Sequence, residues 1–171
     1  NISNFYNIKD YLYILNGALI SDLIVLILFY YSPLMTKTKT LFRWYNTFGL
    51  SAIIADVLSL VLGIVITRFI FTHFKLKYNI FKFIAILVCV QLTHDLLFYA
   101  LFKNIKRNTN KMLDLFKDYA SEYKFHILYA DAIMLIIAFV SASYLSKISI
   151  NSNIVILICL LYLLPYILHT K

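Results

Sequence analysis

The chain has 171 residues, of which 62% are apolar and 14% are charged, and its mean hydropathy is +0.81. A soluble domain of this length does not need continuous apolar runs of about 20 residues, the length that crosses the hydrocarbon layer as a helix. The net charge of +8 comes from Lys and Arg spread over short connections between such runs, which is typical of juxtamembrane segments and does not indicate a nucleic-acid partner. The composition predicts an integral membrane protein whose partner is the lipid bilayer.

The predicted fold is all-α, a polytopic transmembrane helical bundle formed by a single membrane domain over residues 1–171. A helix satisfies its own backbone hydrogen bonds in lipid, and the apolar runs do not alternate as the strands of a barrel would. About five spans are expected, over residues 11–31, 48–71, 83–102, 125–145 and 154–168. The last run is short and contains Pro165, so four spans plus a re-entrant segment are the alternative.

The connections between the spans carry their own signals. Residues 1–10 form a polar lead, and the pair Trp44–Tyr45 in the first connection suits the headgroup layer. Arg68 lies near the end of the second span, from which its side chain can snorkel. Residues 108–124 place apolar side chains at i, i+4, i+7 and i+11, which predicts an amphipathic connecting helix on the membrane surface or continuous with the next span. Residues 151–153 offer cap residues for the last run.

The distribution of Lys and Arg predicts the orientation. The first and third connections and the C-terminus carry more of these residues than the N-terminal lead and the other two connections. The positive-inside rule therefore predicts the N-terminus outside and the connector over residues 103–124 in the cytoplasm.

Four predicted spans each contain an interior aspartate: Asp22, Asp56, Asp95 and Asp131. Measured from the end that the spans share, the four residues lie about 5 to 10 residues deep, or roughly 7 to 15 Å at 1.5 Å per residue. An aspartate near a helix centre costs roughly 2.5–3.5 kcal/mol on insertion scales. The sequence thus predicts an acidic layer shared by four helices and shielded from lipid.

Asp56 shares its predicted helix face with small residues, which let a neighbouring helix approach closely. The expected helix-packing residues are Gly49, Ala52, Ser59 and Gly63.

The favoured function is the handling of cations or protons by a channel or transporter-like protein. Acidic rings select cations and chains of carboxylate and His groups relay protons. The candidate ion- or proton-binding residues are the four aspartates Asp22, Asp56, Asp95 and Asp131, with His94, Gln91 and Asn16 tuning them. A bound cation and a homo-oligomer are left open, and no other cofactor is predicted.

Two alternatives remain open. In the first, protonated aspartates are polar clamps between helices of a structural protein, although such bonds average only about 0.6 kcal/mol. In the second, carboxylates and His94 hold a metal in a lipid-modifying membrane enzyme. The sequence contains none of the common hydrolase, metalloprotease or P-loop motifs, and adjacent His94 and Asp95 are expected about 100° apart on a helix. The sequence favours a non-enzymatic role, and no catalytic residue is assigned.

Four short segments resemble uncharacterised multispanning membrane proteins of large nucleocytoplasmic DNA viruses of algae and protists. The segments are residues 16–22 (NGALISD), 51–57 (SAIIADV), 93–99 (THDLLFY) and 116–120 (FKDYA). That group has no established activity, so no functional residues carry over. The resemblance implies a viral protein of a virion's internal membrane or a host cell membrane, and it adds weight to a structural or assembly role.

Overall fold

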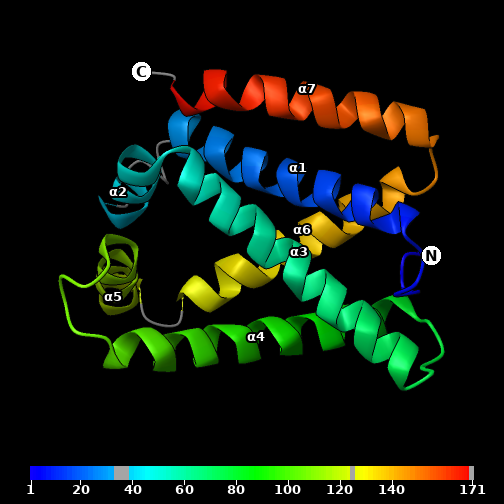
Figure 1. Ribbon diagram of the computed structural model, residues 1–171, viewed down its shortest axis with the longest axis horizontal. Coiled ribbons are helices and arrows are strands. Elements are labelled where there is room, and N and C mark those ends of the chain that lie inside the picture. The colour runs from blue at the N-terminus through cyan, green and yellow to red at the C-terminus, as the bar shows by residue number, and fades with distance from the viewer. Residues whose placement is uncertain (33–38, 124–125, 170–171) are drawn as a thin grey trace.

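The computed structural model describes residues 1–32, 39–123 and 126–169, which form seven helices (Figure 1). Five of these helices are long and apolar enough to cross a membrane, and α2 and α5 are shorter. The predicted all-helical membrane bundle is therefore confirmed. The helices are α1 (Lys9–Tyr31), α2 (Lys39–Phe48), α3 (Leu50–His73), α4 (Ile80–Asn104), α5 (Lys111–Tyr123), α6 (His126–Leu145) and α7 (Ile150–Leu168).

Helix α1 is the centre of the bundle. It makes its most extensive contact with α6 and also packs against α7 and α3, while α4 packs against α3 and α6 (Figure 1). In the apolar window of α1, 61% of the residues are buried, compared with 11% in α4 and in α7. Most of the surface of α1 is therefore enclosed by other helices, whereas most of the surface of α4 and α7 is not.

The helix starts differ by one to four residues from the expected ones, and two of the differences have a clear local cause. Gly49 has a φ of +49°, a conformation that favours glycine, and it separates α2 from α3, so α3 begins at Leu50 and not at residue 48. Gly49 consequently lies in a turn and not on a packing face, where an added Cβ would contact only the Leu168 side chain at 3.9 Å. Helix α7 begins at Ile150, because Ser149 accepts a hydrogen bond from the Ser152 backbone N–H as its N-cap. The helix continues past Pro165.

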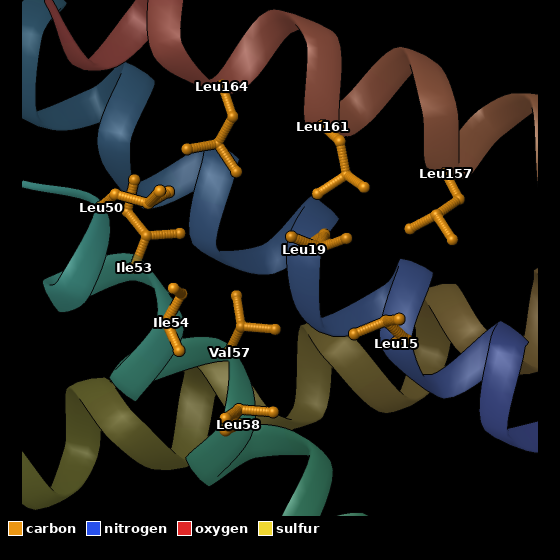
Figure 2. A pocket seen from close by; sticks show the side chains of 10 residues that line it. All are labelled: Leu15, Leu19, Leu50, Ile53, Ile54, Val57, Leu58, Leu157, Leu161 and Leu164. Carbon is orange, nitrogen blue, oxygen red and sulfur yellow. The ribbon is translucent and has the colours of Figure 1, made fainter.

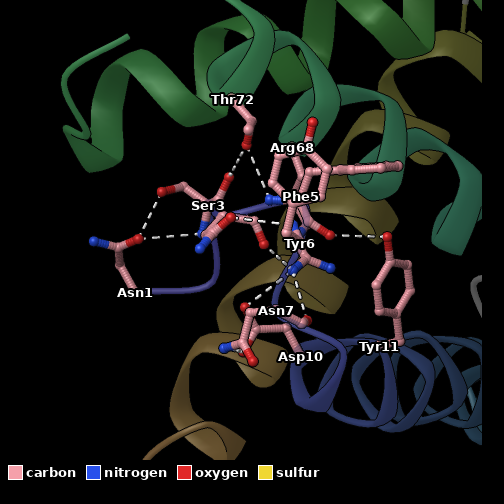
Figure 3. Close-up of polar contacts among 10 residues, drawn as sticks. Asn1, Ser3, Phe5, Tyr6, Asn7, Asp10, Tyr11, Arg68 and Thr72 are labelled. Carbon is pink, nitrogen blue, oxygen red and sulfur yellow. Dashed lines mark hydrogen bonds and ion pairs between the residues drawn. The ribbon is translucent and has the colours of Figure 1, made fainter. Parts of the chain in front are cut away.

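The N-terminal lead folds over the end of α3 and buries Arg68, which corrects the expectation that this side chain snorkels. The Arg68 Nη2 group donates to Asp10 Oδ2 at 3.0 Å, to the Asn7 carbonyl at 3.1 Å and to the Asn4 carbonyl (Figure 3). Its guanidinium carbon lies 4.7 Å from the centre of the Tyr11 ring. The charge remains inside because the lead supplies an opposite charge and backbone acceptors, which compensate for the lost hydration.

Helices α2 and α5 pack together at the other end of the bundle, the left-hand end in Figure 1. Trp44 and Tyr45 are 6% and 2% exposed, so this pair is buried between helices and its side chains do not project from the surface of the bundle. The predicted amphipathic connector is α5, whose Phe116 ring lies 5.0 Å from the Trp44 ring. The expected junction between the connector and the fourth span, at residues 124 and 125, lies outside the described residues.

Replacing Asp118 with asparagine will test how α5 is held. Asp118 accepts from Arg107 and from Arg43, each at 2.9 Å, and because these pairs are partly exposed we expect a loss of less than about 1 kcal/mol at neutral pH. Hydrogen bonds from Arg107 and then Arg43 lower the pKa of Asp118 from its ordinary 3.8. The contribution is therefore complete above about pH 5, declines below the unfolded pKa and is lost as the pH falls through the lower folded-state pKa.

The measurement is the free energy of unfolding of both proteins as a function of pH. The difference between wild type and Asp118→Asn should be constant from neutral pH to about pH 5 and should shrink in stronger acid. A difference that grows as the solution is acidified would contradict this account.

An apolar pocket of about 210 Å³ opens between α1, α3 and α7 (Figure 2). Ten Leu, Ile and Val side chains line it, among them Leu19, Val57 and Leu161. Its lining residues all come from candidate spans and carry no polar side-chain atom, so the pocket suits hydrocarbon and is chemically separate from the aspartates described next.

Candidate functional site

The four intramembrane aspartates come from α1, α3, α4 and α6. Asp22 lies within electrostatic range of Asp56, Asp56 within range of Asp131, and Asp131 within range of Asp95. The arrangement is a row of neighbouring carboxyl groups across the bundle. Among the described residues, no group of three or more His, Cys, Asp or Glu side chains could hold a metal ion.

Asp22 is the most deeply enclosed of the four. It lies on the central helix α1 and is 1% exposed, and neither of its carboxyl oxygens has a hydrogen-bond partner among the described residues. The phenol of Tyr45, on α2, is within electrostatic range of Asp22 and Asp56. Burial, and then these carboxyl groups, hold the pKa of Tyr45 well above its ordinary value. The phenol therefore stays protonated near neutral pH and keeps its ability to donate a hydrogen bond.

Asp56 is tied to α2. The Trp44 indole N–H donates to its Oδ2 at 2.8 Å, and the Asp56 backbone carbonyl accepts from Ser59 Oγ at 2.8 Å. Sequence reasoning missed Trp44 and Tyr45 as parts of this site. The available signal was the spacing of Leu41, Trp44, Tyr45 and Phe48 at i, i+3, i+4 and i+7, which is typical of an amphipathic helix that buries one face.

Asp95 lies at the edge of the row, on α4. Its Oδ1 accepts from Gln91 Nε2 at 2.7 Å and lies 3.1 Å from His94 Nδ1, while its Oδ2 is buried with no partner among the described residues. Although adjacent residues start about 100° apart around a helix, the side chains of His94 and Asp95 contact each other. The His94 side chain is 40% exposed, so this pair connects the row of acids with the outer surface of α4.

Asn16 lies six residues before Asp22, at the interface with α7. Its Nδ2 donates to the Asn153 backbone carbonyl at 2.8 Å, and Asn153 Nδ2 in turn donates to the Leu145 carbonyl at 3.0 Å. These bonds attach the start of α7 to α1 and to the end of α6. Asn16 thus contacts α7, whereas Gln91 and His94 directly contact an acid of the row.

Two of the small residues predicted for helix packing lie at buried positions on α3. Ala52 and Gly63 are buried, and a Cβ added at Gly63 would lie 3.3 Å from a Leu135 methyl group. The closest helix approach is elsewhere, at Gly17 on α1, where an added Cβ would lie 2.3 Å from the Ala138 carbonyl oxygen of α6. Next to this crossing, Ser21 Oγ donates to the Met134 carbonyl at 2.8 Å. Gly17 and Ser21, near the middle of α1, are the sequence signal for this contact.

Comparison with known proteins does not identify a family for this chain. No protein-family model, curated protein or solved structure matches the chain. The protein is an integral membrane protein, because five of its helices have the length and composition of membrane spans.

Proposed function

We propose that the protein handles protons, or a small cation, at the row of Asp22, Asp56, Asp131 and Asp95. The observation that carries this proposal is the Asp22 carboxyl group, which is buried on the central helix with neither oxygen hydrogen-bonded to a described residue. A structural clamp recovers part of its insertion cost by hydrogen bonding across helices, and Asp22 makes no such bond within the described part of the chain. Binding and release of a proton or an ion would explain why a buried carboxyl group has no hydrogen-bond partner among the described residues.

The arrangement of the row favours a proton. A divalent cation such as Ca²⁺ or Mg²⁺ requires about six or more oxygen ligands around one point, whereas a proton needs one carboxyl group at a time and moves between neighbours. Each acid of the row lies within electrostatic range of the next, and the half-exposed His94 beside Asp95 offers an imidazole at its outer end.

Further polar groups lie on α3 near the opposite end of the bundle, beyond the apolar residues 60–66. On α3, Thr67 and Arg68 follow Asp56 by about three turns, and Thr67 Oγ1 donates to the Gly63 carbonyl at 2.9 Å. Arg68 then contacts Asp10 and the N-terminal lead. A route along α3 would therefore have to cross about two turns of helix without a polar side chain, between Ser59 and Thr67. By the charge rule, the α2–α5 end of that route faces the cytoplasm.

A second candidate function is structural, and a specific observation favours it. The Trp44–Asp56 hydrogen bond joins α2 to α3, as a polar clamp would. In that case the protein is a structural or assembly component of a membrane, and the viral resemblance of the four segments supports a virion or host cell membrane as the setting.

Proton flux into liposomes separates the two candidates. Purified protein is reconstituted in liposomes that contain a pH-sensitive dye, and a pH gradient is applied with potassium and valinomycin present to compensate charge. We expect flux with the wild type and the level of protein-free liposomes with Asp22→Asn and with Asp56→Asn. Asparagine keeps the shape of the side chain, and at position 56 its carbonyl can still accept from Trp44, but it cannot carry the proton.

The matched control is Asp114→Asn, outside the row, where the acid accepts from the Asn108 backbone N–H and an amide carbonyl can replace it. This variant should retain flux. Flux that survives in both aspartate variants of the row would refute the proposal. An absence of flux in the wild type, with weaker helix association in Asp56→Asn, would favour the structural candidate.

A further inference from the structure

A second pocket, chemically distinct from the acidic row, lies at the end of the bundle between α2 and α5. It has a volume of about 310 Å³ and is lined by residues of α2, α5 and the loop before α5. Arg43, Arg107 and Lys111 supply its positive charges, and Phe48 and Leu115 are among its apolar lining residues. The pocket therefore combines a basic lining with an apolar part, close to the residues where α3 enters the membrane.

Asp118 holds the two guanidinium groups in this pocket. Its Oδ2 accepts from Arg43 Nη1 and its Oδ1 from Arg107 Nη1, both at 2.9 Å. A guanidinium carries five N–H donors in a rigid fork, and each contact with Asp118 engages one nitrogen. The acid thus orients both arginines, although they come from different parts of the chain, and leaves further donors for an anion.

The balance of charge favours a phosphate group. Three cationic side chains line the pocket with two carboxylates, Asp114 and Asp118, which leaves one net positive charge. Hydrogen bonds from the arginines lower the pKa of Asp118, so it remains ionised and keeps orienting them at neutral pH. Arginine forks match the oxygens of phosphate, and basic clusters at the ends of membrane spans attract anionic lipids.

We propose that this pocket binds a phosphate anion through Arg43, Arg107 and Lys111, as the headgroup of an anionic phospholipid or as free phosphate. Asp118 is a positioning residue of the site. The proposal does not depend on proton transfer by the acidic row.

Trp44 provides the test, because it is the only tryptophan of the chain and is adjacent to Arg43. The purified protein in detergent is titrated with short-chain phosphatidic acid, with short-chain phosphatidylcholine and with inorganic phosphate, while tryptophan fluorescence and, separately, lipid retention by native mass spectrometry are recorded. We expect saturable binding of phosphatidic acid and weaker binding of the zwitterionic lipid. Saturation by inorganic phosphate in the same range identifies free phosphate as the ligand, and saturation by phosphatidic acid alone identifies a lipid headgroup.

Variants with equal loss of charge show whether the pocket is responsible. Arg43→Gln/Arg107→Gln should weaken binding about tenfold or more, since charge-assisted hydrogen bonds are lost. Lys103→Gln/Lys106→Gln removes the same charge at the same end, outside the pocket lining, and should bind as the wild type. Lys111→Gln leaves the arginine contacts with Asp118 intact and should also weaken binding. The proposal would be overturned if neither phosphatidic acid nor inorganic phosphate bound, or if binding were unchanged in the arginine and Lys111 variants.

Discussion

Replacing Gly17 with alanine will destabilise the bundle more than any other replacement of glycine by alanine in this chain. The new Cβ would lie 2.3 Å from the Ala138 carbonyl oxygen and 2.8 Å from the Ala142 nitrogen, both of them backbone atoms of α6. Backbone of a packed helix cannot move aside as a side chain can, so α1 and α6 must separate. We expect a loss at the upper end of the about 1–3 kcal/mol that overpacking costs, measured as the free energy of unfolding of the purified protein.

Gly63→Ala is the matched control for this prediction. Its Cβ would lie 3.3 and 3.4 Å from the two Leu135 methyl groups, which can rotate away. Alanine also has the better helix propensity by about 1 kcal/mol, which offsets the remaining strain. Equal destabilisation by the two variants would show that the α1–α6 crossing is not the tightest packing in the bundle.

Asp10→Asn will have the second large effect on stability. The variant leaves the Arg68 guanidinium, 0% exposed at its side chain, without an opposite charge. Removing one partner of a buried ion pair costs about 3–5 kcal/mol, because the other charge stays desolvated. The measurement is again the free energy of unfolding, with protease cleavage in the N-terminal lead as a second readout.

The double variant Asp10→Asn/Arg68→Met is the internal test. Methionine removes the charge and keeps much of the apolar length of the side chain, so the double variant should lose less stability than the sum of the single variants. The exposed pair provides the contrast: Arg43→Met should cost less than about 1 kcal/mol. Strict additivity of Asp10→Asn and Arg68→Met would mean that the pair does not act as a unit.

The burial of Arg68 and of Trp44 could not be predicted from the sequence. Both residues are close to a span end, a position that predicts snorkelling for Arg68 and headgroup contacts for Trp44. Their burial depends on other segments: the lead residues supply the acceptors for Arg68, and α5 covers Trp44. Neither contact has a signal in the local sequence, because the partners are separated by about 60 residues or more.

The four acids of the row, by contrast, were partly predictable from the sequence. A common depth for these four residues is predicted from their positions, since a membrane fixes where each helix begins and ends. Whether a carboxyl group is hydrogen-bonded does not follow from depth. Asp22 lies on the central helix with neither carboxyl oxygen hydrogen-bonded to a described residue, whereas Asp56 accepts from the indole of Trp44, because the turn at Gly49 folds α2 back against the bundle.

The sequence by itself determined that this is a membrane protein of about five helical spans with acids in four of them, because hydrophobic length and the cost of burying charge are properties of the individual segments. Only the tertiary structure decided that α1 is the central helix, that Gly17 is the closest crossing, and that Arg68 pairs with Asp10. The physical reason is that apolar helices present similar surfaces to lipid and to one another, so the choice of neighbours rests on small residues and hydrogen bonds between distant parts of the chain.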